Sequence, residues 1–398
     1  MENKMKIGGH PHGMGGHPQG KGGHPGGHPG MNVDYDKNPF IVIWETTRAC
    51  GLKCQHCRAD AQPDPHPEEL SHEQGIALID EIYAMDNPIL VFTGGDCMLR
   101  KDLFELADYA IKKGMRVSMS PSATVEVTKE RMDMAKEVGI SRWSFSIDGA
   151  DAKTHDAFRG VEGTFDLTIE KLKYLNEIGI SHQINTCINK ANLHQLEQMA
   201  ELMKELKTSV WYILMMIPTG RASLDDCITA AEHEEVFKWL YELSKNAPYD
   251  IKTTAGQHYR RVVFQQRAKE NGTTGEGITF EGTKTRDMAQ FIDGLARAPK
   301  AVNDGNGFIF VSHTGDVSPS GFLPLVVGNV KENRLRDIYR ESPILKDLRS
   351  PDKYEGKCGI CEYNKVCGGS RARAYAATGN YMASEPFCVY IPEKMRKK

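Results

Sequence analysis

Three closely spaced thiols lie in the stretch Trp44-Glu45-Thr46-Thr47-Arg48-Ala49-Cys50-Gly51-Leu52-Lys53-Cys54-Gln55-His56-Cys57, at C-x3-C-x2-C spacing. The stretch follows residues 40–44, an apolar run that we expect to form a buried strand. A loop leaving a strand can wrap three such thiolates around one 4Fe-4S cluster, and one of the four irons then has no protein ligand. A zinc knuckle or unliganded core cysteines are less favoured, because zinc prefers two well-separated Cys/His pairs.

The spacing resembles that of the radical S-adenosylmethionine (SAM) superfamily. This resemblance implies that Cys50, Cys54 and Cys57 hold a cluster whose open iron binds SAM, which is cleaved reductively to a 5'-deoxyadenosyl radical. The demanding chemistry then belongs to the cofactor, and the sequence identifies no catalytic side chain.

Short apolar runs alternate with helical stretches from residue 40 onward. Expected strands cover 40–45, 89–93, 115–120, 142–147, 182–188 and 211–217. Expected helices cover 71–85, 102–113, 128–138, 164–178 and 193–206, with a further helix near 230–245. This alternation predicts an α/β fold, a partial (β/α)6 barrel of the TIM type, in which chemistry sits at the carboxyl ends of the strands.

Candidate SAM ligands follow these predicted strands. Gly94-Gly95-Asp96 ends the second strand, where paired glycines permit close backbone approach and a carboxylate can accept from an ammonium. It resembles the family's Gly-Gly-Glu motif, which binds the SAM amino group, although Asp96 is one methylene shorter than Glu and Cys97 replaces the usual proline. A plain strand-to-helix turn is the alternative.

Further candidates lie on the later strands. Ser146 and Asp148 belong to a stretch that resembles the family's Ser-x-Asp-Gly signature. Arg159 has a guanidinium suited to a carboxylate, which in similar proteins is that of SAM, and a surface ion pair is the alternative. Asn185 on strand five and Pro218-Thr219-Gly220-Arg221 after strand six are weaker candidates for walls of the SAM pocket.

A second cysteine group comprises Cys358, Cys361, Cys367 and Cys388. Four thiolates can ligate a closed 4Fe-4S cluster suited to electron transfer or redox tuning, and structural zinc is the competing interpretation. The region resembles the SPASM (twitch-like) domain of many radical SAM enzymes, and this architecture covers about residues 38–395. Ser320 and Ser370 stand where such domains commonly have cysteines, so we expect one auxiliary cluster rather than two.

These features predict four segments: a disordered Gly/His/Pro tail (1–37), the radical SAM barrel (38–235), a connecting or substrate region (236–305) and a small Cys-rich SPASM-like domain (306–398). The tail is expected to be solvated, with weak metal or haem-iron binding by its histidines as an alternative. For His258, Arg260 and Arg261 a solvated helix face is favoured over contact with an anionic substrate. His258 is also a candidate ligand for a substrate iron.

Charge and hydropathy limit the partners and the cellular location that we expect. A net charge of -3 gives no basic footprint for nucleic acid. No run approaches the roughly 20 apolar residues that span a membrane, and no signal peptide is apparent, so we expect no membrane association and a cytoplasmic location. Clustered cysteines suit metal ligation in a reducing compartment.

The substrate class follows from resemblance alone. The stretch 356–379, together with Pro218-Thr219-Gly220-Arg221 and the Gly-His-Pro tail, resembles the anaerobic haem-biosynthesis branch (haem b or haem d type), which removes propionate-derived carbon from iron tetrapyrroles by hydrogen abstraction. Reduced ferredoxin or flavodoxin is the expected electron donor. The main alternative is a maturase that modifies a ribosomally made peptide, and an iron-sulfur electron carrier without catalysis is less favoured.

Overall fold

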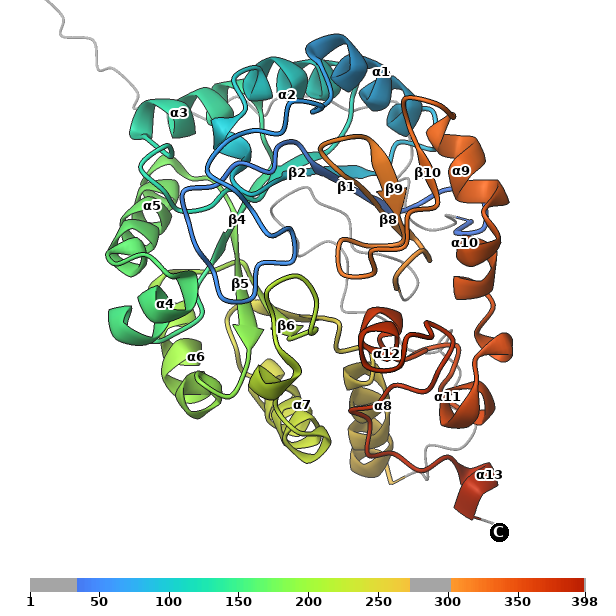
Figure 1. Cartoon of the computed structure of the whole chain (residues 1–398). Coiled ribbons are helices and arrows are strands. Elements are labelled where there is room, and N and C mark those ends of the chain that lie inside the picture. The colour runs from blue at the N-terminus through green and yellow to red at the C-terminus, as the bar shows by residue number, and fades with distance from the viewer. Residues whose placement is uncertain (1–33, 273–301, 397–398) are drawn as a thin grey trace, which may run out of the picture.

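The computed structural model describes residues 34–272 and 302–396, which are organised around one curved sheet (Figure 1). Its parallel strands β1 to β7 run in sequence order. They are Ile41–Glu45, Ile89–Thr93, Val117–Met119, Arg142–Ser146, His182–Ile188, Val210–Met215 and Asp250–Thr254. On the other side of β1 lie β8 (Phe308–Val311), β9 (Asp316–Ser318) and β10 (Gly328–Asn329), of which β8 is parallel to β1 and the other two form antiparallel pairs.

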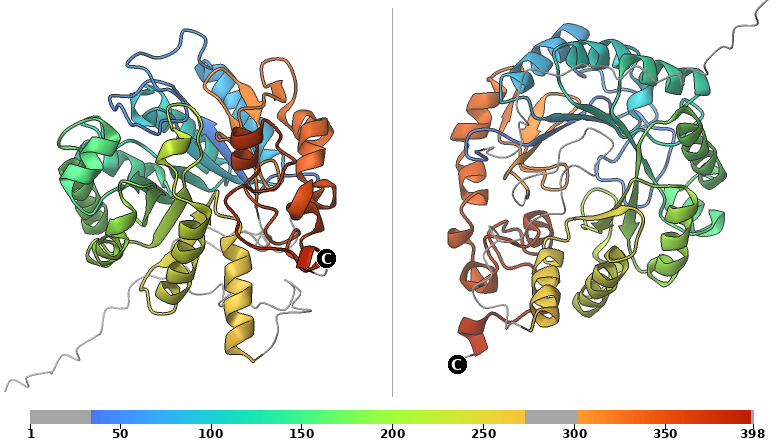
Figure 2. Two further views of the ribbon diagram at one scale, coloured as in Figure 1. Left: turned by 60° about the horizontal axis from the view of Figure 1, so that its bottom comes forward. Right: turned by 180° about the vertical axis from the view of Figure 1, so that it is seen from behind.

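Helices cover the outer side of this sheet, as Figures 1 and 2 show. In order, α1 to α8 are His72–Tyr83, Leu103–Lys112, Lys129–Val138, Ala152–Arg159, Thr164–Ile178, Leu196–Glu205, Ala230–Ser244 and Tyr259–Glu270. The later helices α9 to α13 are Leu335–Glu341, Pro343–Leu348, Gly356–Ile360, Arg371–Thr378 and Glu393–Arg396. Because α9 packs on α1 and α7 packs on α8, the C-terminal segment occupies the side of the curved sheet between its first and last helices.

The predicted alternation of strands and helices is confirmed, with boundaries within a few residues. Two strands were not predicted as members of the barrel sheet. β7 extends it beyond β6, and β8, which lies in the predicted C-terminal domain, pairs with β1. The sheet therefore crosses both predicted segment boundaries, at 235 and 305. β7 was missed because Asp-Ile-Lys-Thr-Thr is polar, and its residues are all only partly buried.

The core between the sheet and the outer helices is dense around β1. Trp44 is fully buried and lies 5.6 Å from the ring of Phe92 on β2. Gly75 on α1 permits this packing, because a Cβ there would lie 2.8 Å from the Trp44 ring. This packing fixes Trp44, the first residue of the stretch 44–57 that carries the three cysteines, on a rigid strand, since close-packed interiors tolerate little displacement.

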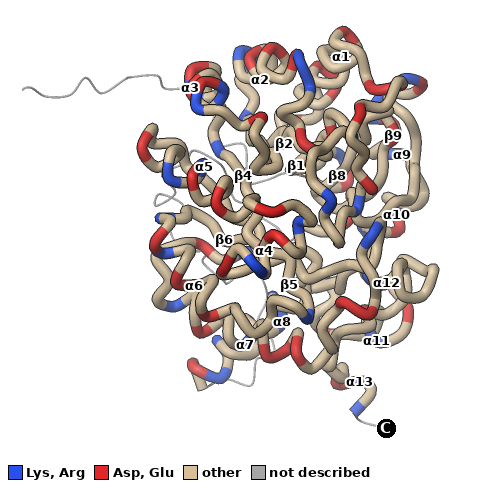
Figure 3. Tube along the Cα trace, turned by 60° about the vertical axis from the view of Figure 1, so that its left-hand side comes forward, with Lys and Arg blue, Asp and Glu red and all other residues tan. Residues whose placement is uncertain are grey.

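The N-terminal boundary differs slightly from the prediction. Residues 34–37, predicted as part of the tail, form a turn, and Tyr35 is buried with its carbonyl accepting 2.7 Å from the Tyr339 hydroxyl. The remainder of the predicted tail, residues 1–33, lies outside the described residues, as do residues 273–301 of the predicted connecting region. Acidic and basic residues are interspersed along the outer helices (Figure 3). None of the helices described is long and apolar enough to cross a membrane.

Candidate functional site

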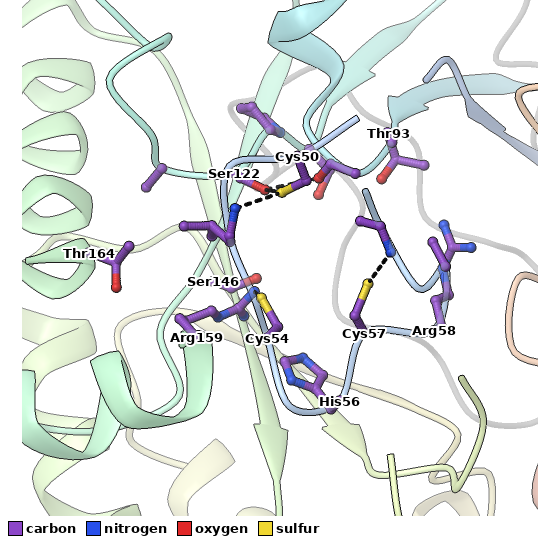
Figure 4. Close-up of a pocket in the computed structure, with 18 of the residues that line it drawn as sticks. Cys50, Cys54, His56, Cys57, Arg58, Thr93, Ser122, Ser146, Arg159 and Thr164 are labelled. Atoms are coloured by element: carbon purple, nitrogen blue, oxygen red, sulfur yellow. Dashed lines mark hydrogen bonds between the residues drawn. The ribbon is translucent and has the colours of Figure 1, made fainter. Parts of the chain in front are cut away.

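The three thiols of the C-x3-C-x2-C stretch line one cavity of ≈ 200 Å³ at the carboxyl ends of the strands (Figure 4). Gly94, Gly95, Ser146 and Arg159, all predicted as SAM ligands, line the same cavity. The structure therefore brings together residues from the ends of β1, β2 and β4 and from α4, although they are far apart in the sequence. This confirms the expected position of the site.

Each of the three sulfurs has a nitrogen donor. The backbone N–H of Leu52 donates to Cys50 Sγ at 3.4 Å, and that of Ala61 donates to Cys57 Sγ at 3.4 Å. Arg159 Nη1 donates to Cys54 Sγ at 3.8 Å. Hydrogen bonds to sulfur stabilise ligating thiolates and tune the clusters they hold. Burial raises the pKa of the Cys50 thiol, so a bound cation is needed to favour its thiolate.

Glycines from three neighbouring loops hold the cysteine loop by close backbone contact. A Cβ on Gly95 would lie 2.4 Å from the Ala49 carbonyl oxygen, and one on Gly160 would lie 2.5 Å from the Lys53 carbonyl oxygen. At Gly220 the corresponding distance, to the Cys57 carbonyl oxygen, is 2.3 Å. Only glycine permits these approaches, which fix the loop before and after its thiols.

A carboxylate that the sequence did not reveal holds the start of the same loop. Glu69 Oε1 accepts from the Thr47 hydroxyl at 2.8 Å and from the Arg48 N–H at 3.0 Å. It also accepts from the His66 N–H at 3.0 Å, which ties the loop to the segment before α1. No motif surrounds Glu69, so only the fold identifies it.

Asp96 occupies a different position from the one its motif suggested. Its carboxylate is fully buried and accepts from the Thr124 hydroxyl at 2.7 Å, from the Met98 N–H at 3.1 Å and from the Ser122 N–H at 3.3 Å. Burial raises its pKa to about 6 despite these donors. Asp96 is not among the residues that line the cavity, and its oxygens stabilise the turn that carries Gly95.

Asp148 and Arg159 form a buried pair. Arg159 Nε donates to Asp148 Oδ2 at 2.7 Å, and the Cys187 N–H donates to Asp148 Oδ1 at 2.7 Å. Burial alone would raise the pKa of Asp148, but the adjacent Arg159 guanidinium keeps it below its usual value. The surface ion pair considered for Arg159 is therefore wrong: its partner is a fully buried carboxylate that directs the guanidinium toward Cys54.

Asn185 lies beside Ser146 in the register of β4 and β5 but does not line the cavity. Its side-chain oxygen accepts from Gln183 Nε2 at 2.7 Å. Of the four residues predicted after strand six, only Arg221 is among the lining residues. Its Nε donates to the Cys54 carbonyl at 3.0 Å, so it contacts the cysteine loop as well as the cavity.

Arg58, which directly follows the last thiol, supplies a third guanidinium to the cavity, after those of Arg159 and Arg221. Its Nη1 lies 2.9 Å from Glu45 Oε2, and its guanidinium carbon lies 4.5 Å from the centroid of the Phe310 ring. The other oxygen of Glu45 lies 2.7 Å from His313 Nδ1. The sequence prediction ended at Cys57 and missed Arg58, although its place beside a ligating cysteine was a signal.

The four C-terminal thiols Cys358, Cys361, Cys367 and Cys388 line a separate small cavity of ≈ 30 Å³. The N–H of Glu385 donates to Cys358 Sγ at 3.2 Å, and that of Gly369 donates to Cys367 Sγ at 3.4 Å. Burial raises the pKa of Cys361 to about 11 and that of Cys367 to about 12, so a cationic group is needed to keep these thiols ionised.

These residues suit a cluster in their donor chemistry. In the described part of the chain, no three His, Cys, Asp or Glu side chains converge closely enough for a single metal ion. The fit of either thiol group to a cluster therefore rests on its shared cavity and its N–H donors. Ser320 and Ser370 are both buried, and Ser370 accepts from the Arg373 N–H at 3.1 Å as the cap of α12.

The basic segment near residue 258 is not a solvated face. His258 and Arg261 are buried, and Arg261 pairs with Glu234 at 2.5 Å. Arg260 is partly buried and donates to the Val302 carbonyl at 2.8 Å and to the Val366 carbonyl at 3.2 Å. His258 lines the small C-terminal cavity and is not among the residues that line the cavity of the three cysteines. The prediction failed because later residues cover this helix.

Comparison with known proteins agrees with this geometry. Residues 44–203 match the Radical SAM superfamily. A protein of Nitratidesulfovibrio vulgaris named AdoMet-dependent heme synthase is 43% identical over 89% of this chain and 93% of its own length. A protein of Methanosarcina barkeri with the same name is 38% identical over 89% of this chain and 98% of its own length.

The fold is also known in an experimental structure. Streptococcus suis SuiB bound to S-adenosylmethionine superposes with a TM-score of 0.66 at 16% identity, over 89% of this chain and 78% of that one. The chain therefore belongs to the radical SAM superfamily, in the haem-biosynthesis branch that its relatives represent.

Proposed function

We propose that this protein catalyses a SAM-dependent step of haem synthesis, the oxidative decarboxylation of propionate side chains on an iron tetrapyrrole. The observation that carries this proposal is the identity of 43% and 38% to proteins named AdoMet-dependent heme synthase, each over 89% of the chain. Iron coproporphyrin has propionates where haem has vinyl groups, so it is the substrate we test.

The cavity beside the three cysteines is proposed to bind SAM. Gly94 and Gly95 line it and can approach the ligand closely, Ser146 offers a hydroxyl, and Arg159 offers a guanidinium near Cys54. Asp96 and Asp148 are assigned supporting roles, because their carboxylates are buried and already accept hydrogen bonds. Asn185 is likewise proposed to support the wall that carries Ser146.

Two cations in the same cavity suit a substrate with carboxylates. Arg58 is held by Glu45 and Arg221 by the Cys54 carbonyl, so both guanidiniums are positioned before substrate arrives. Guanidinium-carboxylate pairs are strong and directional, and preorganisation reduces the entropy lost on binding. Phe322 lines the cavity beside Arg58 and adds an apolar ring that can contact a macrocycle.

The balance of the reaction gives the second thiol group a role. When bound at its cluster, SAM supplies a 5'-deoxyadenosyl radical after one-electron reduction, for which reduced ferredoxin or flavodoxin is the proposed donor. Removing one hydrogen atom from a propionate and releasing CO2 forms a vinyl group and leaves one electron to be removed. Cys358, Cys361, Cys367 and Cys388 are proposed to hold one auxiliary 4Fe-4S cluster that accepts this electron.

Anaerobic turnover tests the proposal. Reconstituted protein is mixed with SAM, dithionite and iron coproporphyrin III, and products are followed by mass spectrometry and by the Soret band. We expect vinyl-bearing products that require SAM, together with 5'-deoxyadenosine. No spectral change with iron coproporphyrin, combined with deoxyadenosine formation stimulated by a peptide, would assign the protein to the peptide maturases instead.

A further inference from the structure

His258, directly before α8, is a fully buried imidazole without a hydrogen-bond partner. Its exposed fraction is 0%, and neither Nδ1 nor Nε2 has a donor or acceptor within reach among the described residues. A buried polar group left unsatisfied costs about 1–3 kcal/mol. Such a group is unusual in a native protein and calls for an explanation, such as a bound ion.

The packing around the ring is specific. The Phe237 ring contacts it edge-on at a centroid distance of 4.6 Å, and the His233 ring is stacked at 5.7 Å. Neighbouring polar side chains do not bond to the imidazole: Gln257 Nε2 donates to Asn303 at 2.8 Å, and Arg261 pairs with Glu234. The imidazole is therefore held in place by ring contacts, and its nitrogens remain available to whatever occupies the space beside it.

That space is the cavity of the four C-terminal thiols. His258 lines it together with Cys358, Cys361, Cys367 and Cys388. Four thiolates already supply one protein ligand for each iron of a 4Fe-4S cluster, so a fifth ligand is not needed. A cluster does, however, present sulfide and thiolate sulfurs that accept hydrogen bonds.

We propose that His258 donates an N–H hydrogen bond to a sulfur of the auxiliary cluster and thereby raises its reduction potential. The inference rests on the auxiliary cluster of the proposed function. The reduced cluster is one unit more negative than the oxidised one, so the donor stabilises the reduced form more. In the reaction proposed above, a higher potential makes this cluster a better acceptor for the electron left after decarboxylation.

The test compares full-length His258→Phe and His258→Gln with the wild type, all reconstituted anaerobically. Phenylalanine keeps the ring shape without a donor, and glutamine keeps a donor. Potentials are measured by redox titration with EPR detection, with SAM added, because SAM changes only the signal of the open-iron cluster. We expect His258→Phe to shift the equilibrium of the auxiliary cluster about tenfold toward its oxidised form, which lowers the reduction potential by about 59 mV for one electron. The reduction potential of His258→Gln should lie nearer that of the wild type.

His182 provides a matched control, because it is also buried, with an unpartnered Nε2, but lines neither cavity. His182→Phe should leave the potential unchanged. An unchanged potential in His258→Phe would overturn the inference. If that variant does not retain its cluster, pulsed EPR of wild-type protein carrying ¹⁵N-histidine decides: nitrogen coupling to the auxiliary cluster supports the bond, and its absence refutes it. Wild-type protein with only about 4 iron per chain would instead refute the auxiliary cluster itself.

Discussion

Replacing Gly220 by alanine tests how the cysteine loop is held. Gly220 has φ +61°, a left-handed backbone conformation that residues with a side chain rarely adopt. A Cβ there would lie 2.3 Å from the Cys57 carbonyl oxygen and 2.7 Å from the Arg58 Cα. Both contacts are with backbone, so no side-chain rotation can relieve them.

The cost has two parts. Left-handed backbone costs a residue with a side chain about 1–2 kcal/mol. To lengthen the 2.3 Å contact to 3.0 Å the loop must move by about 0.7 Å at its last thiol. That displacement weakens the hydrogen bond from the Arg221 N–H to the Cys57 carbonyl, now 3.0 Å, at about 1 kcal/mol. Together they destabilise the loop that positions the three cysteines by about 2–3 kcal/mol.

Iron analysis separates this local effect from general destabilisation. Two 4Fe-4S clusters imply about 8 iron and about 8 sulfide per wild-type chain. Gly220→Ala should lose the SAM-responsive EPR signal and retain about 4 iron, because the C-terminal thiols are untouched. The control is Gly179→Ala, with φ +75° but nothing within 4 Å of the added Cβ. If both variants load iron and cleave SAM equally, the close contact at Cys57 does not hold the loop.

Three further predictions test the two thiol groups and their surroundings. Cys54→Ala should abolish 5'-deoxyadenosine formation with SAM and dithionite, whereas Cys361→Ala should leave uncoupled cleavage; equal cleavage by both would contradict the division of roles. The pKa of Asp96 is about 6 in the folded protein and 3.8 in the unfolded chain, so its contribution to stability is full below about pH 4 and is lost as pH rises through 6. The loss amounts to about 3 kcal/mol. Asp96→Asn should therefore flatten the pH dependence of the thermal midpoint. Arg373→Met should cost about 3–5 kcal/mol in anaerobic unfolding, since it leaves Glu385 buried and unpaired, whereas loss of the exposed Arg336–Asp337 pair should cost under about 1 kcal/mol.

The barrel was predictable because its signals are local. Apolar strands such as 182–188 and the thiol spacing depend on neighbours in the sequence, and the structure reproduces β5 residue for residue. Gly94 and Gly95 were also identified, although part of their role differs from that expected. They approach the backbone of the cysteine loop, with the Gly95 N–H donating to the Thr47 carbonyl at 2.8 Å, in addition to lining the cavity.

Contacts between distant segments were not predictable. The interpretation of His258 as solvated failed because the cavity that it lines is enclosed partly by Glu385, Cys388 and Tyr390, which lie more than a hundred residues later in the chain. The same limit hid Glu69, whose partners belong to a loop about twenty residues earlier. Periodicity reports which face of an element is apolar but does not identify what covers it.

The C-terminal thiols are connected to the barrel by a short chain of hydrogen bonds. Arg373 is fully buried and donates to the Met215 carbonyl at the end of β6 at 3.0 Å and to the Ala255 carbonyl after β7 at 2.6 Å. It pairs with Glu385 at 3.2 Å, and the N–H of Glu385 donates to Cys358 Sγ at 3.2 Å. Arg373 and Glu385 thus connect the ends of the barrel strands to a thiol of the second group. Because Arg373 and Glu385 are both buried, this connection holds the two cavities in fixed relation, which suits the electron transfer to an auxiliary cluster that we propose.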